Sequence, residues 1–265
     1  MRIGLITTRK APGREGSVMI EVADQLARRN HSFESICPED SLIDLARVKV
    51  EHDLYLLKAG TPSALAYAGV LDLAGARILN PYGVVTRMKD KVLASRILAD
   101  ARVPAPEAFI ASDARQFGPL LSEGPLVIKP YVGGSQGRGV QIIRTIEELD
   151  GLVSEQDLMF AQRYHQPEGR DHKIYRIGDQ VFGVWRVWPA RTLEDKLGEP
   201  FELTAAMKEI TTLCGDAFGI DLYGLDIVVS GGREYVVDIN TFPGFKGVSG
   251  AGALLADYIA RILDR

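Results

Sequence analysis

Strand-like and helix-like patterns alternate over the first eighty residues of the chain. Short apolar runs predict strands at 2–6, 33–36, 53–57 and 76–80. Helices are predicted between them, because residues 18–26 carry Val or Leu at every fourth position, and because Thr61 and Pro62 form a helix start whose helix ends before Gly75. This alternation is typical of a parallel sheet, so we expect a Rossmann-like N-terminal lobe, although it lacks a Gly-x-Gly-x-x-Gly turn.

The pattern changes between the turn at 80–83 and the proline cluster at 103–106, which bracket a single predicted helix. The elements predicted next are a strand at 109–111, a helix opened by Ser112, strands at 126–129 and 140–144, and a helix opened by the capping box Thr145-x-x-Glu148. Strands and helices in this order indicate a compact α+β lobe.

The last hundred residues predict a sheet with few helices. The expected elements are strands at 158–163, 172–177 and 180–187, a helix at 204–218 with the apolar stripe Ala206, Ile210, Leu213 and Ala217, two further strands and a closing helix. We therefore predict an α/β protein of three lobes: a Rossmann-like lobe at 1–85, a central α+β lobe at 86–160 and a C-terminal antiparallel-sheet lobe at 161–265.

Composition narrows the class of protein. With 46% hydrophobic and 25% charged residues the chain of 265 residues is typical of globular proteins, and its net charge of −4 argues against a nucleic-acid partner. Cys37 and Cys214 lie too far apart to suggest a disulfide framework or a zinc site. The apolar opening at 3–6 is too short for a signal peptide or a membrane span, so we expect a cytoplasmic protein with no membrane partner.

A glycine-rich loop follows the predicted strand 126–129. Lys129 ends the strand, and Gly133, Gly134, Gly137 and Gly139 follow it. Glycines let backbone N–H groups approach phosphate oxygens closely, and a lysine beside them adds a positive charge. The order Gly-Lys-Ser/Thr of a Walker P-loop is absent. A flexible hairpin without a ligand would carry the same pattern, so both interpretations stay open here.

A second signal lies in the two strands around Gly231 and Gly232. A two-residue turn there would place Asp226 opposite Val237, whereas a three-residue loop would place Asp226 opposite Asp238, with Asn240 on the same face. We expect the second arrangement, because two carboxylates and an amide oxygen on one face suit Mg²⁺. Solvated strand-edge aspartates are the alternative, but their neighbours along both strands are apolar.

These motifs together resemble the ATP-grasp superfamily. The resemblance rests on Asp90-Lys91, on Lys129 before the glycine loop, on Gln162-Arg163-Tyr164 and on Asp226 followed by Asp238-Ile-Asn-Thr-Phe-Pro-Gly, and it spans about residues 85–250. The chain is most similar to the RimK-like branch, which contains ribosomal-protein glutamate ligases and related glutathione-synthetase-type enzymes. The resemblance implies an ATP-grasp fold.

The resemblance also implies a set of site residues. Nucleotide binding is expected of Lys91, Lys129, Gly134, Ser135, Gly137, Gln162, Arg163, Tyr164 and Asp171, with the lysines and the loop on the phosphates, Gln162 on the adenine, the backbone of residues 163–164 on the purine and Asp171 on the ribose. Metal binding is expected of Asp226, Asp238 and Asn240. The ion would be Mg²⁺, with Mn²⁺ as an alternative. The family usually has Glu where this chain has Asp238, which leaves the number of ions open.

The implied activity is an ATP-dependent ligase. A substrate carboxylate would attack the γ-phosphate to give an acyl phosphate, which an amine would then displace, with Lys129 and Arg186 as the catalytic residues. Arg9, Lys10 and Arg14 follow the first strand and are candidates for contact with an anionic substrate. The partners would be small-molecule carboxylates and amines, and a homo-oligomer is compatible with the sequence. The glycine loop is expected to order over the triphosphate.

Two other functions remain alternatives. Lys58, the segment 173–179 and the segment 238–248 are similar to inositol polyphosphate kinases, which share the fold and whose acceptor would be a phosphorylated polyol. The glycine loop lacks the histidine that those kinases tend to carry. The third alternative is a non-catalytic ATP-binding module, which would bind nucleotide without acceptor-dependent release of ADP.

Overall fold

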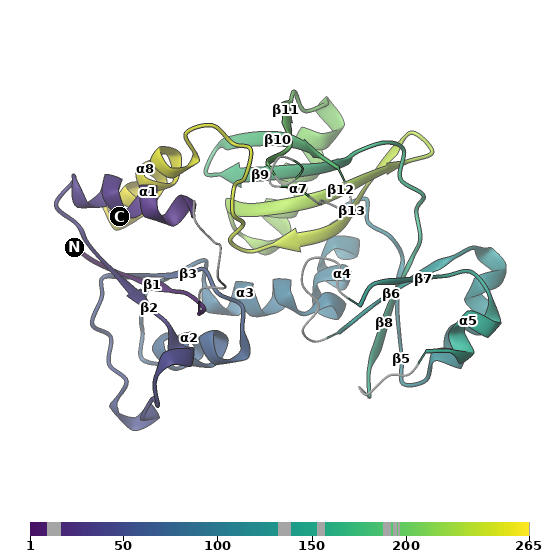
Figure 1. Cartoon of the computed structure of the whole chain (residues 1–265), viewed down its shortest axis with the longest axis horizontal. Coiled ribbons are helices and arrows are strands. Elements are labelled where there is room, and N and C mark those ends of the chain that lie inside the picture. The colour runs from purple at the N-terminus through teal and green to yellow at the C-terminus, as the bar shows by residue number, and fades with distance from the viewer. Residues whose placement is uncertain are drawn as a thin grey trace.

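Three sheets succeed one another along the chain. The computed structural model describes residues 1–9, 17–131, 139–152, 157–187, 192, 195 and 197–264. Figure 1 shows a four-stranded sheet at the N-terminal end, a second four-stranded sheet at the opposite end of the long axis, and a five-stranded sheet above and between them. None of the described helices is long and apolar enough to cross a membrane.

The N-terminal sheet is parallel, as its alternating pattern predicts. Its strands, in the order β2-β1-β3-β4, are β1 (Arg2–Ile6), β2 (Ser32–Ile36), β3 (Leu54–Leu57) and β4 (Ile78–Leu79). Helix α2 (Pro62–Leu73) begins at Thr61, whose side chain accepts a hydrogen bond from the Ala64 amide, and it covers one face of the sheet. Strands β2 and β3 are joined by two short 3₁₀ turns, Pro38–Asp40 and Leu45–Arg47, in place of a helix.

The other face of this sheet is covered by helices from both ends of the described chain. Helix α1 (Val18–Ala27) packs against α8 (Ala251–Leu263), and both lie above the N-terminal strands in Figure 1. The buried side chains of these helices share a core with the five-stranded sheet. The division into lobes at 85 and 160 stays a prediction, but α8 shares its core with α1, and residue 160 lies within a strand.

Two helices replace the single helix predicted after residue 83. They are α3 (Tyr82–Lys89) and α4 (Lys91–Asp100), and Asp90 separates them with an extended backbone, φ −76° and ψ 106°. The Asp90 carboxylate caps α4, because Oδ1 accepts hydrogen bonds from the amides of Val92 and Leu93. The interruption follows from the preference of aspartate for an N-cap over a helix interior.

The second sheet is antiparallel. Its strands, in the order β5-β8-β6-β7, are β5 (Ala108–Ala111), β8 (Met159–Arg163), β6 (Leu126–Lys129) and β7 (Gln141–Ile143). A 3₁₀ helix (Ala114–Glu123) and α5 (Ile146–Asp150) pack on it. The 3₁₀ helix is capped by Asp113 rather than by the predicted Ser112, because Asp113 forms a capping box with Gln116.

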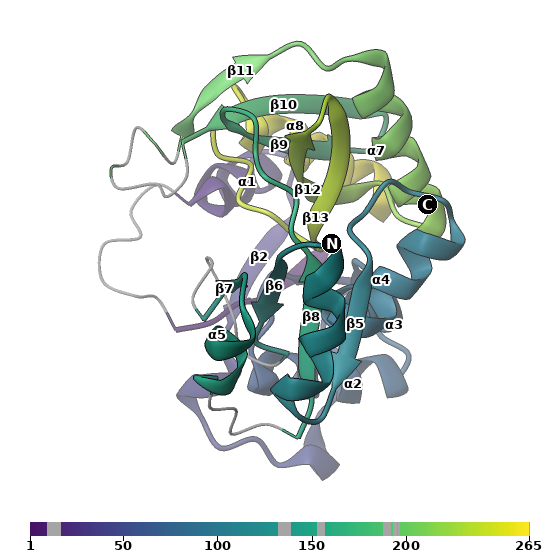
Figure 2. The same cartoon turned by 90° about the vertical axis from the view of Figure 1, so that its right-hand side faces the viewer.

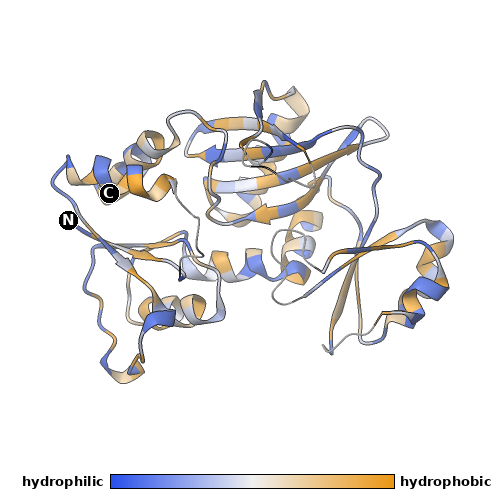
Figure 3. Cartoon of the chain, viewed as in Figure 1, coloured by the Kyte–Doolittle hydropathy of each residue, from blue (hydrophilic) through white to orange (hydrophobic). Residues whose placement is uncertain are grey.

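The five-stranded sheet has the order β11-β10-β9-β12-β13 (Figure 2). Its strands are β9 (Asp171–Ile177), β10 (Gln180–Arg186), β11 (Glu199–Phe201), β12 (Leu222–Ser230) and β13 (Arg233–Asn240). Figure 3 shows hydrophobic and hydrophilic residues alternating along these strands, as expected for a sheet with two different faces. One face is covered by α7 (Ala205–Phe218).

The buried stripe of α7 matches the predicted one only in part: Ile210 is buried as predicted and Leu213 and Ala217 are partly buried, but the other fully buried positions lie one residue further along. Ala206 is exposed, whereas the buried residues are Met207, Ile210, Thr211, Cys214, Gly215 and Phe218. Alanine and leucine at helical spacing fit either of two adjacent stripes, and the larger side chains of Met207 and Phe218 face the sheet because they bury more apolar area.

Candidate active site

The hairpin of β12 and β13 sets two aspartates opposite each other. Gly231 and Gly232 form a two-residue turn with φ of 58° and 69°, so Ser230 pairs with Arg233 and not across the predicted three-residue loop. The register then shifts between Asp226 and Ile227, and beyond this bulge Asp226 lies opposite Asp238. The predicted pairing is present, but a β-bulge rather than the turn produces it.

The extra residue of the bulge, Val237, also accepts a hydrogen bond from a lysine of another sheet. Val237 has no partner on β12, and its carbonyl oxygen accepts a hydrogen bond of 2.9 Å from Lys129 Nζ. Lys129 ends β6, so this contact joins the second sheet to the five-stranded sheet. The bulge thus brings the ammonium of Lys129 next to the two aspartates.

A cation already neutralises part of the negative charge on this face. Lys173 Nζ on β9 lies 2.6 Å from Asp226 Oδ2, and Asn240 Nδ2 donates a hydrogen bond of 3.3 Å to the same oxygen. Asp238 reaches solvent, but the surrounding walls of the cleft partly desolvate its carboxylate and raise its pKa, the neighbouring Asp226 raises this pKa further, and Lys129 opposes both effects. Burial and the same neighbour raise the pKa of Asp171 to about 6.

This set of donors fits Mg²⁺. Two carboxylates face each other, and Asn240 lies opposite Gly224, two residues further along the same face. Among the described residues no group of three His, Cys, Asp or Glu side chains is arranged to hold a metal ion. A magnesium ion here would therefore take few protein ligands, as Mg²⁺ bound between carboxylates and nucleotide phosphates usually does.

Lys91 is anchored where α4 begins. Its Nζ lies 3.4 Å from the Tyr131 carbonyl oxygen, and the Tyr131 hydroxyl donates a hydrogen bond of 2.8 Å to Asp90 Oδ2. Asp90 thereby caps α4 and also fixes the first residue of the predicted glycine loop. Burial lowers the pKa of Lys91, and the negative charge of Asp238 opposes this effect.

A narrow pocket joins these residues to the predicted adenine contact. It is lined by Met88, Lys91, Ala94, Ser95, Leu98, Ala105, Lys129, Phe160, Gln162, Val236, Val237, Asp238 and Ile239. Gln162 on β8 is only 7% exposed, and its side chain makes no hydrogen bond with the residues that the structure describes. Apolar walls, one free amide and two lysines near the aspartates are an arrangement suited to a purine nucleotide.

The backbone amides of residues 163 and 164, which were predicted to contact the purine, already donate hydrogen bonds within the protein. The Arg163 amide donates to the Glu107 carbonyl, and the Tyr164 amide donates to the Pro125 carbonyl. The Arg163 guanidinium binds the carbonyl oxygens of Leu120 and Gly124, so it anchors the 3₁₀ helix. Their role in nucleotide binding stays a prediction. Gly134, Ser135 and Gly137, and the expected ordering of their loop, lie outside the described residues.

Arg186 reaches the same sheet face from β10. It lies opposite Asp171 in the register of β9 and β10, and its Nη2 donates to the Tyr175 hydroxyl at 2.5 Å. Its Nε is buried without a hydrogen-bond partner among the described residues. An arginine with an unused donor beside the acidic face is suited to contact an anion.

Several cations that the sequence singled out have structural partners. Lys58 Nζ donates to the carbonyl oxygens of Phe242 and Pro243, at 2.7 and 2.6 Å. Arg9 binds Asp40 Oδ1 at 2.9 Å and the Glu39 carbonyl oxygen at 2.7 Å. Lys10 and Arg14 lie outside the described residues. The features similar to the kinases thus include Lys58, which links two lobes, and Lys173, which pairs with an aspartate.

Lys89 is an exposed cation near the site that sequence reasoning missed. It ends α3, and partial desolvation of its ammonium lowers its pKa, with the charge of Asp238 opposing this effect and that of Lys91 adding to it. No motif marks it, because its neighbours come from other parts of the chain. Only the adjoining pair Asp90-Lys91 placed it near the cleft.

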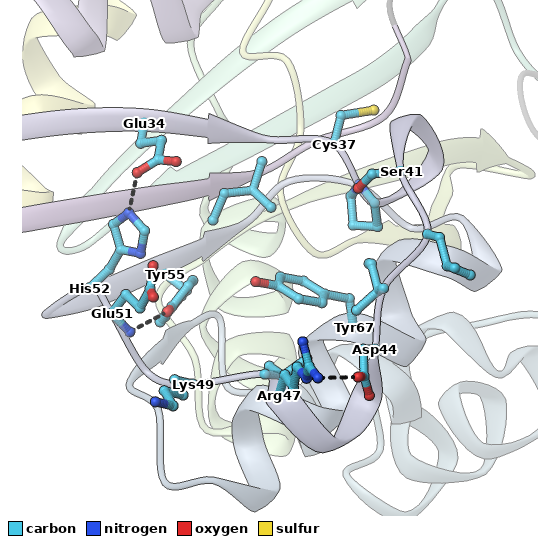
Figure 4. Close-up of a pocket in the computed structure, with 15 residues that line it drawn as sticks. Glu34, Cys37, Ser41, Asp44, Arg47, Lys49, Glu51, His52, Tyr55 and Tyr67 are labelled. Carbon is cyan, nitrogen blue, oxygen red and sulfur yellow. Dashed lines mark hydrogen bonds and ion pairs between the residues drawn. The ribbon is translucent and has the colours of Figure 1, made fainter.

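A larger hollow lies away from this cleft. It has a volume of about 350 Å³ and is lined by residues between Glu34 and Tyr67 (Figure 4). It forms where the connection between β2 and β3 has no helix to cover the sheet. In Figure 4 His52 lies beside Glu34, to which Nε2 is bonded at 3.0 Å, and Arg47 pairs with Asp44.

Comparisons with known proteins agree with this geometry. Residues 88–263 match the model of the RimK-like ATP-grasp domain. The alpha-aminoadipate–LysW ligase LysX of Saccharolobus solfataricus is 28% identical over 200 residues, which cover 69% of this chain and 72% of that protein. A probable alpha-L-glutamate ligase of Haemophilus ducreyi is 26% identical over 230 residues, which cover 81% and 74% of the two chains.

Solved structures share the fold. The RimK-domain ATP-grasp protein from Sphaerobacter thermophilus superposes with a TM-score of 0.76 at 18% identity, over 98% of this chain and all of that chain. The ATP-grasp ligase PsnB, solved with a minimal precursor, Mg and ADP, superposes with a TM-score of 0.68 at 18% identity, over 98% and 96% of the two chains. At these identities the likeness concerns the fold.

Proposed function

Because the chain belongs to the RimK-like ATP-grasp family, and is therefore an ATP- and Mg²⁺-dependent ligase that joins a carboxylate to an amine, we propose that the cleft between Lys129 and Asp238 is its active site. The observation that carries the proposal is the β-bulge, because it sets Asp226 against Asp238 and presents the Val237 carbonyl to Lys129. Gln162, Lys91 and Lys129 line one pocket with Asp238.

The reaction has two group transfers. In the first, a carboxylate oxygen forms a bond to the γ-phosphorus of ATP, and the bond to the β-γ bridging oxygen breaks with its electron pair left on ADP. In the second, the amine nitrogen bonds to the carbonyl carbon of the acyl phosphate, the carbon–oxygen bond breaks, and phosphate leaves with the electron pair while the nitrogen loses a proton. The chain is not required to supply a nucleophile, so positioning and charge stabilisation provide the catalysis.

Each side chain of the cleft has a proposed role. Gln162 hydrogen-bonds the adenine, and Asp171 the ribose. Lys91 and Lys129 bind phosphate oxygens, and the unused Nε of Arg186 contacts the acyl phosphate or the tetrahedral intermediate that follows it. Asp226, Asp238 and Asn240 hold Mg²⁺, which neutralises phosphate charge when bound. Mn²⁺ in its place stays a prediction.

The substrates are proposed from the relatives. Two of them are named as ligases of glutamate or alpha-aminoadipate, so we propose an acidic amino acid as one substrate. The second is a small carboxylic acid or a peptide, since PsnB was solved with a precursor. Action in the cytoplasm, where ATP is plentiful, stays a prediction, as does a homo-oligomer.

Release of ADP and phosphate tests the function directly. Purified enzyme with MgATP is supplied with L-glutamate or L-2-aminoadipate and with pools of carboxylic acids and short peptides. We expect ADP release that requires both an amine and a carboxylate, together with a new amide detected by mass spectrometry. When the reacting carboxylate carries ¹⁸O, one labelled oxygen must appear in the released phosphate, because the acyl phosphate carries it there.

Two other assay results would contradict the ligase reaction. Phosphate retained on a polyol would identify a kinase. Nucleotide binding with no acceptor-dependent ADP release across the pools would identify a non-catalytic module. The variant Asp238→Asn tests the proposed metal site, because it removes one ligand with little change in side-chain volume. It should lower turnover at least about 100-fold.

A further inference from the structure

Tyr131 binds two successive residues at the start of α4. Its hydroxyl donates a hydrogen bond of 2.8 Å to Asp90 Oδ2, and its carbonyl oxygen lies 3.4 Å from Lys91 Nζ. Asp90 is the N-cap of α4, and Lys91 is the first residue of this helix. The side chain and the backbone of one residue on the second sheet's side of the cleft are therefore both attached to the beginning of α4.

The Asp90 carboxylate is a rigid acceptor for the Tyr131 hydroxyl. Its other oxygen, Oδ1, accepts hydrogen bonds of 2.9 and 3.0 Å from the amides of Val92 and Leu93. These two bonds cap the helix and fix the orientation of the carboxylate, so the direction of Oδ2 is fixed as well. A hydrogen bond to a carboxylate is stronger than one between neutral groups. The attachment of Tyr131 to α4 is therefore well defined.

The segment that carries Tyr131 is held from the opposite side by the five-stranded sheet. Lys129 lies two residues earlier, at the end of β6, and its Nζ donates a hydrogen bond of 2.9 Å to the Val237 carbonyl oxygen on β13. Pro130, between Lys129 and Tyr131, restricts the backbone of this short segment. The start of α4 is thus tied to a fixed strand end, and the Tyr131 contacts determine how Lys91 is placed relative to Lys129.

Lys91 keeps donors for a ligand while Tyr131 orients it. An ammonium has three N–H donors, and a single carbonyl oxygen can engage only one of them. The separation of 3.4 Å exceeds the usual limit of about 3.2 Å for such a bond, so the carbonyl holds the ammonium loosely. Lys91 and Lys129 line the same pocket as Gln162. A side chain already held near its bound position loses less conformational freedom when the ligand binds.

We propose that Tyr131 is a positioning residue that sets the Lys91 ammonium for the nucleotide phosphates. The hydroxyl, bonded to Asp90, fixes the residue, and the carbonyl oxygen of the same residue then seats the ammonium. The inference rests on the proposed active site, in which Lys91 binds phosphate oxygens. Tyr131 takes no part in the making or breaking of bonds, because it acts through Lys91.

Binding of Mg-AMPPNP, a non-hydrolysable analogue of MgATP, tests the proposal without any organic substrate. By calorimetry, Tyr131→Phe should weaken this binding about fivefold, because the hydroxyl that fixes the residue is lost. Lys91→Met should weaken it about tenfold. In the Lys91→Met background, Tyr131→Phe should change the affinity less than about 1.5-fold, because no ammonium remains to be positioned. A purely structural role of Tyr131 would weaken binding by the same factor in both backgrounds.

Tyr258→Phe is the matched control. Its hydroxyl also donates a hydrogen bond to a carboxylate, that of Asp221, and Tyr258 lies on α8. The control variant therefore loses the same kind of bond as Tyr131→Phe, and it should change Mg-AMPPNP affinity less than about twofold.

Asp90→Ser examines the other end of the hydrogen bond. Serine is a good N-cap, so α4 should keep its start, but the shorter side chain has no second oxygen for Tyr131. Tyr131→Phe should therefore have almost no effect on Mg-AMPPNP affinity in the Asp90→Ser background. A fivefold effect there would show that the hydroxyl acts through a partner other than Asp90, which contradicts the proposal.

The possible failures are distinguishable. If Tyr131→Phe binds Mg-AMPPNP as tightly as the native enzyme, or if its effect persists without Lys91, the role of Tyr131 is wrong and the active site stands. If Lys91→Met binds as tightly as the native enzyme, Lys91 does not contact the phosphates, and both its role in the active site and this inference are wrong. If the native enzyme does not bind Mg-AMPPNP, the proposed active site itself is wrong.

Discussion

The Lys173 ammonium lies 2.6 Å from Asp226 Oδ2, across the neighbouring strands β9 and β12. The carboxylate proposed to hold Mg²⁺ therefore has a cation beside it before any metal binds. Asp226 raises the pKa of both Asp171 and Asp238, and Lys173 counteracts both of these rises. Lys173 and a metal ion would thus compensate the same negative charge.

Lys173→Met should make the stability of the protein depend on Mg²⁺. Without the ammonium, the aspartates repel one another in the free enzyme, and we expect a lower melting temperature in EDTA. Mg²⁺ with ADP should recover most of the loss, and the Mg²⁺ concentration for half-maximal recovery should be about threefold lower than for the native enzyme, because a competing charge is gone. Thermal unfolding at increasing Mg²⁺ measures both. An equal loss with and without Mg²⁺ would contradict this.

Asp171→Asn should stabilise the metal-free protein at neutral pH. The folded protein raises the pKa of Asp171 to about 6, whereas an unfolded aspartate titrates near 3.9. The folded state therefore binds more protons between these values, and its stability falls as the pH rises from about 4 to 6. Removing the charge should gain about 1 to 2 kcal/mol at pH 7.5, allowing for the partial solvent contact of the side chain.

Urea unfolding of both proteins in EDTA measures the Asp171 effect. The stability difference should be full above pH 6 and vanish below about pH 4. A gain of equal size at pH 4 would show that the substitution acts through packing and not through the carboxylate charge.

The two aspartates show how far sequence reasoning reaches. The period of two along a strand and the glycine pair limited the hairpin to a few registers, and the face that carries Asp226 and Asp238 was predicted from them. The bulge at Val237 was not, because its extra carbonyl is satisfied by Lys129 from another sheet. A local pattern cannot specify a contact whose partner is distant in sequence.

Gln162→Leu should separate stability from nucleotide binding. The Gln162 amide lines the pocket and makes no hydrogen bond with the described residues, so leucine of similar size should change stability by less than about 1 kcal/mol. The same change should weaken MgATP binding about tenfold, because the amide is the proposed adenine contact. Calorimetry and urea unfolding give the two values.

A nucleotide with a different purine base is the control for Gln162→Leu. The native enzyme should prefer MgATP to MgGTP, and Gln162→Leu should lose most of that preference. If the variant keeps the preference, adenine is recognised elsewhere.

Leu255→Ala and Ile259→Ala should each cost about 2 to 4 kcal/mol of unfolding free energy. Both side chains lie on α8, are fully buried and belong to the core that α8 shares with α1. Leu73→Ala is the matched control, since Leu73 is 90% exposed, and it should change stability by less than about 0.5 kcal/mol. Losses below 1 kcal/mol at both α8 positions would show that the helix is loosely docked.

Lys89 and α7 show two features that could not be predicted from the sequence alone. Helical spacing predicted α7, but which of two adjacent stripes faces inward is decided by the sheet beneath it. The Lys89 ammonium lies against Gly60, and no local pattern indicates this, because the two residues belong to different elements. Motifs with a fixed local spacing were therefore predictable, and the contact between Lys89 and Gly60 was not.

The pairing of α1 with α8 constrains the order in which the protein can be completed. Strands β1 to β4 are made before residues 251–263, yet these residues form one wall of their core. Until the ribosome has delivered α8, Val22, Leu26 and the apolar face of β1 lack part of their packing partners. One face of the nascent first sheet therefore stays incompletely covered until α8 has been made.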